Sequence, residues 1–265
     1  CLESVYRTTQ GLTYEVWVVD NASSDGSAEM VRQRFPQVQL IQNTQNVGFA
    51  RANNQAIRRS SGRYVLLLNS DTQAHPGALE ALVSFMDGSP RAGAAGAQLL
   101  NPDHSVQRSC HPMPTLGREV WRLFHLDRLL RLASYPMQGW DPKLPRQVDV
   151  VQGACLVLRR QALDEVGLLD EDYFMYSEEV DLCYRLRRAG WEVWWVPGAR
   201  VLHYGGQSSS QASTAMFLQL YRSKYLFFKK AYGRPAALAL ARPRRAQLLE
   251  KARLYRQLLV QLPGM

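Results

Sequence analysis

The chain has 265 residues, of which 46% are hydrophobic and 21% are charged, a balance typical of a globular protein that excludes a disordered or fibrous chain. Its apolar runs, such as residues 64–68 and 235–241, are far shorter than the roughly 20 residues of a membrane-spanning helix. The net charge is +9, yet residues 222–265 hold eleven Lys or Arg against one Glu, so the tail is basic and the body is nearly neutral.

The first part of the chain alternates strand and helix patterns. Short β-rich or fully apolar runs predict strands, and apolar residues spaced three and four apart predict helices. Because this alternation is typical of strands joined by crossover helices, it predicts an α/β fold with a mostly parallel sheet and helices on both faces. The expected strands are residues 14–19, 38–41 and 64–68, and the expected helices are residues 30–35, 48–59 and 76–86.

The middle of the chain has a different character. Residues 101–148 contain six prolines, which predict an irregular insertion over the sheet with one short helix near residues 116–132. Strands are expected again at 148–151, 153–158 and 192–196, the last ended by Pro197 and Gly198, with a helix over 160–166. Beyond residue 210 the pattern is helical with a break at 233–235, so we expect a body of residues 1–210 and a basic helical extension of residues 211–265.

Polar side chains follow three of the predicted strands. One such residue at a strand end is a normal turn former, but ligands of open parallel sheets bind where several strands end. The residues concerned are Asp20, Asn21, Asn43, Asn46, Asn69 and Asp71. The chain has neither a dinucleotide-binding glycine motif nor a P-loop, so if phosphates bind here, we expect a divalent cation held by carboxylate oxygens to neutralise them.

A second group of acids opens a predicted helix after Ser177, a plausible N-cap. Glu178, Glu179 and Asp181 occupy its first turn, and three arginines lie near its end. Complementarity to the helix dipole accounts for this charge pattern. The alternative is a catalytic base, whose pKa the dipole lowers and like-charge neighbours raise.

Eight segments in order along residues 1–230 resemble family 2 glycosyltransferases. The segment Leu66–Thr72 is similar to their metal-binding motif, in a form common among rhamnosyltransferase-like members, and Cys1–Val5 resembles the first family helix. The first family strand is accordingly expected to be absent from these 265 residues. The other similar segments are 18–27, 46–54, 153–160, 166–171, 173–186 and 196–208.

This resemblance implies a GT-A fold and an inverting sugar transfer from a nucleotide-sugar that depends on Mg²⁺ or Mn²⁺. Glu179 stands where most members have an Asp as general base; its extra methylene leaves it chemically competent. Asp71 and His203 correspond to cation ligands. The implied substrate-binding residues are Asp20, Asn21, Gly48, Asn53, Asn69, Gly153, Glu178 and Asp181.

The resemblance favours L-rhamnose carried on dTDP as the donor and a glycan or lipid-linked acceptor in cell-surface polysaccharide synthesis. A nucleotidyltransferase is one alternative, although the Gly-rich basic loop of that class is not visible near the start of the chain. A non-catalytic nucleotide-sugar-binding protein is another, against which the intact acids at Asp71, Glu179 and Asp181 argue. The tail interleaves aromatic and basic residues as single-strand-binding surfaces do, but no nucleic-acid partner is expected.

The basic tail predicts contact with an anionic surface. Its apolar residues recur at helical spacing between Leu248 and Leu259, flanked by Lys and Arg, a pattern typical of a helix lying in a membrane interface. The alternatives are a solvated helix face and a stripe that packs on the catalytic domain or on a second subunit. With scattered cysteines and no signal-peptide pattern, we expect a cytoplasmic protein, peripheral at the inner face of the plasma membrane.

Overall fold

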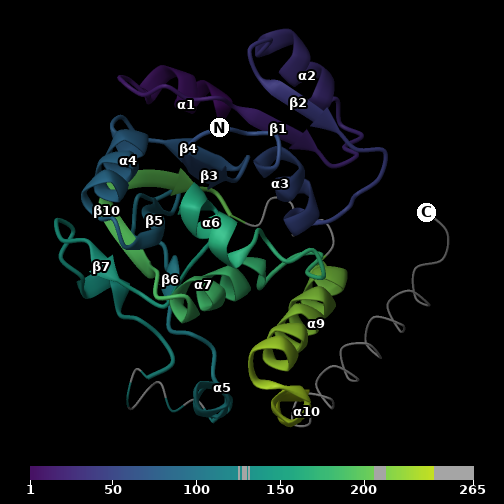
Figure 1. Ribbon diagram of the computed structural model, residues 1–265, viewed down its shortest axis with the longest axis vertical. Helices are drawn as coiled ribbons and strands as arrows, with labels where there is room; N and C mark the ends of the chain where they lie inside the picture. Colours follow the sequence, from purple (N-terminus) through teal and green to yellow (C-terminus); the bar gives the residue numbers. More distant parts are fainter. Residues whose placement is uncertain (125, 127–129, 131, 206–212, 242–265) are drawn as a thin grey trace.

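The computed structural model describes residues 1–124, 126, 130, 132–205 and 213–241 (Figure 1). Its helices are α1 (Leu2–Thr8), α2 (Ser27–Arg34), α3 (Phe49–Ile57), α4 (Ala78–Gly88), α5 (Leu116–Leu123), η2 (Met137–Gly139), α6 (Arg160–Val166), α7 (Glu178–Arg188), α9 (Ser213–Tyr232) and α10 (Arg234–Ala241). Its strands are β1 (Trp17–Asp20), β2 (Gln39–Gln42), β3 (Tyr64–Leu68), β4 (Thr72–Ala74), β5 (Ala92–Leu100), β6 (Cys110–His111), β7 (Arg146–Gln147), β8 (Val150–Val151), β9 (Cys155–Arg159) and β10 (Glu192–His203).

The central sheet has six strands in the order β3-β9-β5-β10-β4, with β7 also paired to β10. Strands β5 and β10 are parallel, whereas β9 runs antiparallel to both of its neighbours, β3 and β5. The sheet is therefore mixed rather than mostly parallel, because β9 enters after the insertion from the edge at which β3 and β5 end. Strands β1 and β2 form a parallel pair of their own, beside α1 and α2 in Figure 1.

Helices cover both faces of the sheet, as predicted for the α/β class. Along β3, Val65 and Leu67 join one core cluster, to which helices α6, α7, α9 and α10 contribute. Leu66 and Leu68 point the other way and pack against a second cluster that includes apolar residues of α1 and α4. This alternation follows from the two-residue period of a strand.

Strand β5 was not expected from the sequence. Its residues Ala92–Leu100 are all buried, but they are mostly Ala and Gly, which give little β signal. A Cβ atom on Gly96 would lie 2.9 Å from Cβ of Val151, and one on Gly93 would lie 2.8 Å from Cβ of Trp191. The small residues of β5 therefore allow neighbouring segments to approach its backbone closely.

The predicted end of the strand at Pro197 is wrong, because β10 continues to His203. Its pairing with β5 is interrupted between Val196 and Arg200 and then resumes. A proline cannot donate to a ladder and is found in strands at irregularities of this kind. The consequence is that His203 stands at the end of a central strand.

The helices after residue 210 are as predicted, with the break at Gly233 (φ +88°). Phe227, Phe228, Ala237 and Leu240 belong to the same core cluster as α7, so α9 and α10 share the core of the body. The apolar stripe expected between Leu248 and Leu259 lies outside the described residues. Among the helices that the structure describes, none is both long and apolar enough to cross a membrane.

Candidate active site

The candidate residues gather at one edge of the central sheet. Strands β3, β5 and β10 point the same way, so Asn69 and Asp71 after β3, Asn101 after β5 and His203 at the end of β10 lie at that edge. Strand β9 runs the opposite way and begins there, which brings Gly153 to the same place. Ligand sites of α/β sheets lie at this carboxyl edge.

Asp71 and His203, the two predicted cation ligands, lie side by side. The Asp71 turn is held because Thr72 Oγ1 donates to the Asn69 carbonyl at 2.7 Å and the Tyr204 N–H donates to the Asp71 carbonyl at 3.0 Å. Asp71 Oδ1 is then 3.3 Å from His203 Nε2, and the two side chains are only 17% and 13% exposed. A carboxylate oxygen and an imidazole nitrogen therefore face the same point.

This pair fits a divalent cation that takes further ligands from a substrate. The described residues contain no group of three or more His, Cys, Asp or Glu able to hold a metal, so of these side chains the described part of the chain brings two together here, Asp71 and His203. Mg²⁺ sites often use one or two carboxylates and substrate phosphates. A cavity of about 350 Å³ beside Asp71 gives such a substrate room, and it is lined by Cys1, Glu3, Ser4, Arg7, Ser70, Asp71, Thr72, Gln73 and Tyr204.

The segment before α7 has an unusual backbone. Tyr176 and Ser177 both have positive φ, +69° and +67°, a conformation that costs energy for residues other than glycine. Ser177 occupies the N-cap position, but its side chain makes no capping hydrogen bond. The strained segment is held from α9, where Ser223 Oγ donates to the Met175 carbonyl at 2.6 Å.

Glu178 and Glu179 form a buried acidic pair at the start of α7. In the part of the chain that is described, Oε2 of each carboxyl is buried without a hydrogen-bond partner. Burial raises the pKa of both carboxyls, and the neighbouring Glu179 raises the pKa of Glu178 further. Burial thus outweighs the helix N-terminus, which alone would lower these pKa values.

Gly153 lies beside Glu179. A Cβ atom on Gly153 would lie 3.9 Å from Cβ of Glu179 and 4.0 Å from the ring of Phe49. The residue after Gly153, Ala154, accepts a hydrogen bond through its carbonyl from the Asn69 N–H at 2.9 Å. The structure therefore links the predicted base to the edge that carries Asp71.

Asp181 does not join this group. Its Oδ2 accepts a hydrogen bond from Arg185 Nε at 2.7 Å, and Arg185 also donates to the carbonyls of Val166 and Leu168 at 2.6 and 2.8 Å. Burial raises the pKa of Asp181 while Arg185 opposes this. Asp181, which was predicted to bind substrate, therefore pairs with the arginine that holds the turn of residues 166–168.

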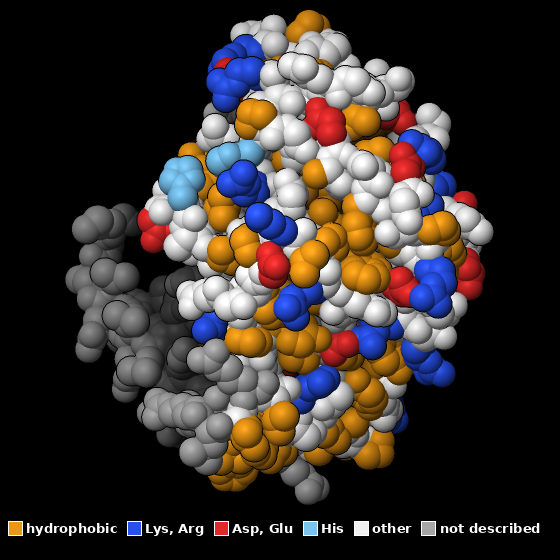
Figure 2. Space-filling model, turned by 90° about the vertical axis from the view of Figure 1, so that its left-hand side faces the viewer, with side chains coloured by type: hydrophobic (Ala, Val, Ile, Leu, Met, Phe, Trp, Pro, Cys, Tyr) orange, Lys and Arg blue, Asp and Glu red, His pale blue; other side chains and the backbone are white. Residues whose placement is uncertain are grey.

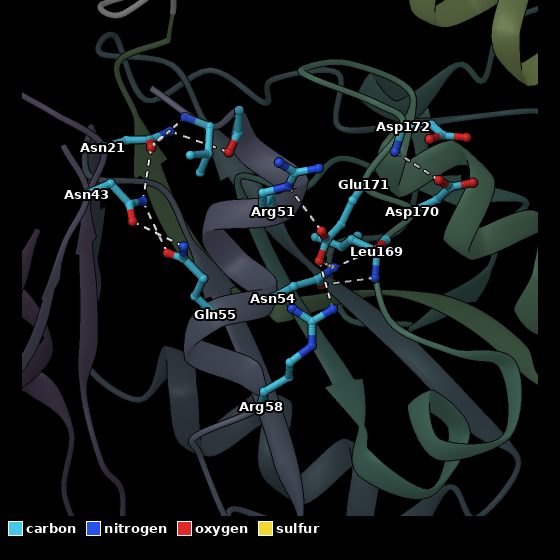
Figure 3. Close-up of polar contacts among 12 residues, drawn as sticks. Asn21, Asn43, Arg51, Asn54, Gln55, Arg58, Leu169, Asp170, Glu171 and Asp172 are labelled. Carbon is cyan, nitrogen blue, oxygen red and sulfur yellow. Dashed lines mark hydrogen bonds and ion pairs between the residues drawn. The ribbon is translucent and has the colours of Figure 1, made fainter. Parts of the chain in front are cut away.

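Asn21 organises the loop of residues 43–48 (Figure 3). Its Oδ1 accepts from the Val47 N–H at 3.0 Å and from Asn43 Nδ2 at 3.2 Å, and its Nδ2 donates to Asn46 Oδ1 at 2.8 Å. The carboxamide is therefore engaged by this loop, the segment that carries Gly48.

Gly48 connects that loop to the segment before α7. Its φ is +87°, and a Cβ atom there would lie 2.5 Å from the carbonyl oxygen of Phe174. The same carbonyl accepts a hydrogen bond from the Phe49 N–H at 2.6 Å.

Two further predicted residues, Asn53 and Asp20, lie on neighbouring elements. Asn53 donates to the Phe49 carbonyl at 2.9 Å, within α3. Asp20 Oδ2, at the end of β1, is buried with no partner among the described residues.

A polar cluster that the sequence did not reveal fixes α3 to residues 169–171 (Figure 3). Asn54, only 1% exposed, donates to the Leu169 carbonyl at 2.7 Å and to Glu171 Oε1 at 3.0 Å. Glu171 also pairs with Arg58 at 2.7 Å and Arg51 at 3.1 Å. Hydrogen bonds from Asn54 and Arg58 lower the pKa of Glu171. These residues lie far apart in sequence, so spacing gives no signal of the cluster.

Comparison with known proteins identifies relatives of this chain. The family model of glycosyl transferase family 2 matches residues 1–167. The N-acetylglucosaminyl-diphospho-decaprenol L-rhamnosyltransferase of Mycobacterium tuberculosis is 34% identical over 226 residues, which are 80% of this chain and 73% of that protein. The low-salt glycan biosynthesis hexosyltransferase Agl10 of Haloferax volcanii is 27% identical over 71% of this chain and 57% of its own length.

Two solved structures share the fold. The mannosyltransferase PcManGT from Pyrobaculum calidifontis, in complex with GDP-Man and Mn²⁺, has a TM-score of 0.56 at 19% identity over 99% of this chain and 76% of its own. GalNAc-T7 with UDP, GalNAc and Mn²⁺ has a TM-score of 0.57 at 15% identity over 86% of this chain and 46% of its own. The predicted GT-A-type fold is confirmed.

Replacement of Glu178 should alter the pH dependence of stability. A carboxyl whose pKa is higher in the folded state stabilises the folded protein at pH values below the pKa of the unfolded state, ordinarily 4.5. This stabilisation is lost as the pH rises through the pKa of the folded state. Glu178→Gln cannot ionise, so at pH 8 it should be more stable than the wild type by at least about 1 kcal/mol. Urea unfolding at a series of pH values measures the difference, which should vanish near pH 4. The control is exposed Asp164→Asn, and parallel curves for wild type and Glu178→Gln would contradict the assignment.

Proposed function

The chain belongs to glycosyltransferase family 2, and we propose that it transfers a sugar from a nucleotide-sugar to an acceptor hydroxyl with inversion at the anomeric carbon. The observation that carries this proposal is the Asp71–His203 pair, 3.3 Å apart, at the carboxyl edge linked to Glu179. The named activity of the mycobacterial relative supports L-rhamnose, carried on dTDP, as the donated sugar and a lipid-linked glycan of a cell-surface polysaccharide as the acceptor.

Asp71 and His203 are the residues that would hold Mg²⁺ or Mn²⁺. A bound divalent cation supplies charge stabilisation to the departing diphosphate. Mn²⁺ in the two solved structures of the same fold supports this cofactor. The cavity beside Asp71 has the size of a small-molecule site, and Arg7 in its lining adds a positive charge for a diphosphate.

Glu179 is the general base that takes the proton of the acceptor hydroxyl. An in-line displacement needs one base on the acceptor side, and its pKa is best matched to the working pH when it lies above that of an ordinary carboxyl. Burial raises the pKa of Glu179 in this way. Glu178 keeps the pair from ionising fully, since two adjacent carboxylates repel each other.

The remaining predicted residues bind the donor or support those that do. Asp20 Oδ2, which has no hydrogen-bond partner among the described residues, binds the nucleoside. Asn21, Gly48 and Asn53 act through the loop and helix that form its pocket. Asn69 and Gly153 border the sugar between Asp71 and Glu179. Asp181 acts through Arg185 as a positioning residue.

Contact with an anionic membrane would suit a lipid-linked acceptor. The side chains of Leu116 and Val120 on α5 and of Phe124 at its C-cap are 36%, 51% and 66% exposed and follow one another at helical spacing, with exposed Leu130 and Leu132 beyond them. Figure 2 shows hydrophobic side chains gathered at the lower end of the molecule, where Figure 1 places α5. The tail of residues 242–265, which is not described, adds six Lys or Arg against one Glu.

Removing the base should stop turnover without preventing donor binding. Glu179→Gln keeps the shape of the side chain but accepts no proton, so kcat should fall by roughly 10²- to 10⁴-fold, while the donor Kd changes little. Release of dTDP from dTDP-rhamnose measures kcat, whereas release of pyrophosphate from dTTP and a sugar 1-phosphate would indicate a nucleotidyltransferase. Glu165→Gln is the control. Collapse of kcat in Glu178→Gln but not in Glu179→Gln would move the base to the neighbouring residue.

Removing the carboxylate of the cation pair should abolish metal-dependent donor binding. Asp71→Ala deletes one of two protein ligands, so the increase in donor affinity that Mn²⁺ gives the wild type should disappear. Calorimetric titration with dTDP-rhamnose, with and without Mn²⁺, measures this, and thermal unfolding checks that the variant is folded. An unchanged Mn²⁺ effect would remove Asp71 from the cation site.

Membrane contact should require both charge and the apolar face of α5. The full chain should float with vesicles containing phosphatidylglycerol at low salt, since each basic residue near such a surface contributes about 1 kcal/mol, and detach as salt is raised. Val120→Glu with Phe124→Glu, or deletion of residues 242–265, should weaken flotation, whereas Met30→Glu on α2 is the control. Equal flotation with neutral vesicles, or none, would contradict the contact.

A further inference from the structure

Gln107 lies directly behind His203, on the side away from Asp71. Gln107 Oε1 is 2.7 Å from His203 Nδ1. The amide nitrogen of the same side chain donates to Asn101 Oδ1 at 2.9 Å and to the backbone carbonyl of His203 at 3.3 Å. One carboxamide therefore contacts both the ring and the backbone of the histidine.

The orientation of this carboxamide follows from its partners. A backbone carbonyl can only accept a hydrogen bond, so the end of Gln107 that faces the His203 carbonyl must be the NH₂ group. The oxygen end then faces Nδ1, and an oxygen of a carboxamide can only accept. Nδ1 of His203 must accordingly carry a hydrogen.

The hydrogen on Nδ1 leaves the other nitrogen of a neutral His203 ring as an acceptor. In a neutral imidazole with hydrogen on Nδ1, Nε2 holds a lone pair. That lone pair faces Asp71 Oδ1 at 3.3 Å, so two acceptors meet with no hydrogen between them. Such a contact is unfavourable alone and becomes favourable when a cation lies between the two atoms.

We infer that Gln107 is a positioning residue that fixes His203 in the Nδ1–H tautomer, so that Nε2 is ready to bind the cation. The inference rests on the cation site proposed above for Asp71 and His203. Partners of this kind, bonded to the outer nitrogen of a metal-binding histidine, set its tautomer and ring orientation. Without Gln107, the Nε2–H tautomer would donate to Asp71 and would have to be displaced by the cation.

The turn after β5 is built to hold Gln107 in this place. The Asn101 N–H donates to the Ser105 carbonyl at 2.9 Å, and the Gln107 N–H donates to the Leu99 carbonyl at 2.8 Å. His104 takes a positive φ of +64° within the turn. The chain thus reverses direction and lays Gln107 beside the end of β10.

The tautomer can be read directly by ¹⁵N NMR of the histidine rings in the full chain. At pH 7.5 without metal, His203 should show the Nδ1–H pattern, and loss of the signal in His203→Gln identifies it among five histidines. Gln107→Met keeps the length of the side chain but replaces the amide oxygen with a much weaker sulfur acceptor, so the signal should change to the Nε2–H pattern. Asn101→Ala should give a partial change, and Gln39→Met on the exposed face of β2 should give none.

Mn²⁺ affinity, measured by electron paramagnetic resonance of the free ion without donor, should fall about 10- to 100-fold in Gln107→Met and stay unchanged in Gln39→Met. An Nε2–H or doubly protonated His203 in the wild type overturns the inference, as does a Gln107→Met variant that keeps both its tautomer and its affinity. Sugar transfer by the wild type is assayed in parallel. A wild type with the Nδ1–H tautomer that neither binds Mn²⁺ nor transfers sugar would contradict the proposed function rather than the role of Gln107 in fixing the tautomer.

Discussion

The close packing against β5 is the constraint on which the rest of the structure depends. This strand is buried along its whole length, and Gly93 and Gly96 leave no space for a side chain between its backbone and Trp191 or Val151. Strands β9 and β10 pair with it from opposite sides. Larger residues in β5 would push these elements apart, and the edge that brings Asp71 and His203 together would lose its geometry.

Burial, rather than the helix dipole, decides the electrostatics of the candidate base. The start of α7 alone would favour ionised carboxylates, yet Glu178 and Glu179 have raised pKa values because they are desolvated. Together with Asp20, they leave buried carboxylate oxygens without partners among the described residues. Unsatisfied buried acceptors cost free energy, so carboxylates of this kind point to a functional role.

Helices α9 and α10 belong to the architecture of the site. Phe227 and Phe228 pack in the same core as α7, and Ser223 holds the strained segment before Glu179 through the Met175 carbonyl. Lys230 contacts both Asp170 and Asp172, at the other end of that segment. The helices after residue 210 therefore support the geometry of the base.

Local sequence determined the elements whose signal is strong within a few residues. Tyr64–Leu68 and Arg160–Val166 were predicted with the bounds that the structure has, because an apolar run or a helical period is a local property. Strand β5 could not be predicted, since Ala and Gly are selected there by close neighbours rather than by β propensity. The end of β10 was missed because Pro197 marks an irregularity in the sheet instead of a strand end.

For the candidate site, the sequence by itself determined which residues were candidates: the acids and amides after predicted strands and the acids at the predicted start of a helix, with His203 added by the family resemblance. Only the tertiary structure decided which of them meet. It paired Asp71 with His203 across 132 positions of sequence, engaged Asp181 with Arg185, and brought Gln107 behind the imidazole from the predicted insertion. These contacts depend on strand order and on backbone reversals, which are set by packing over the whole domain and leave no periodic signal along the chain.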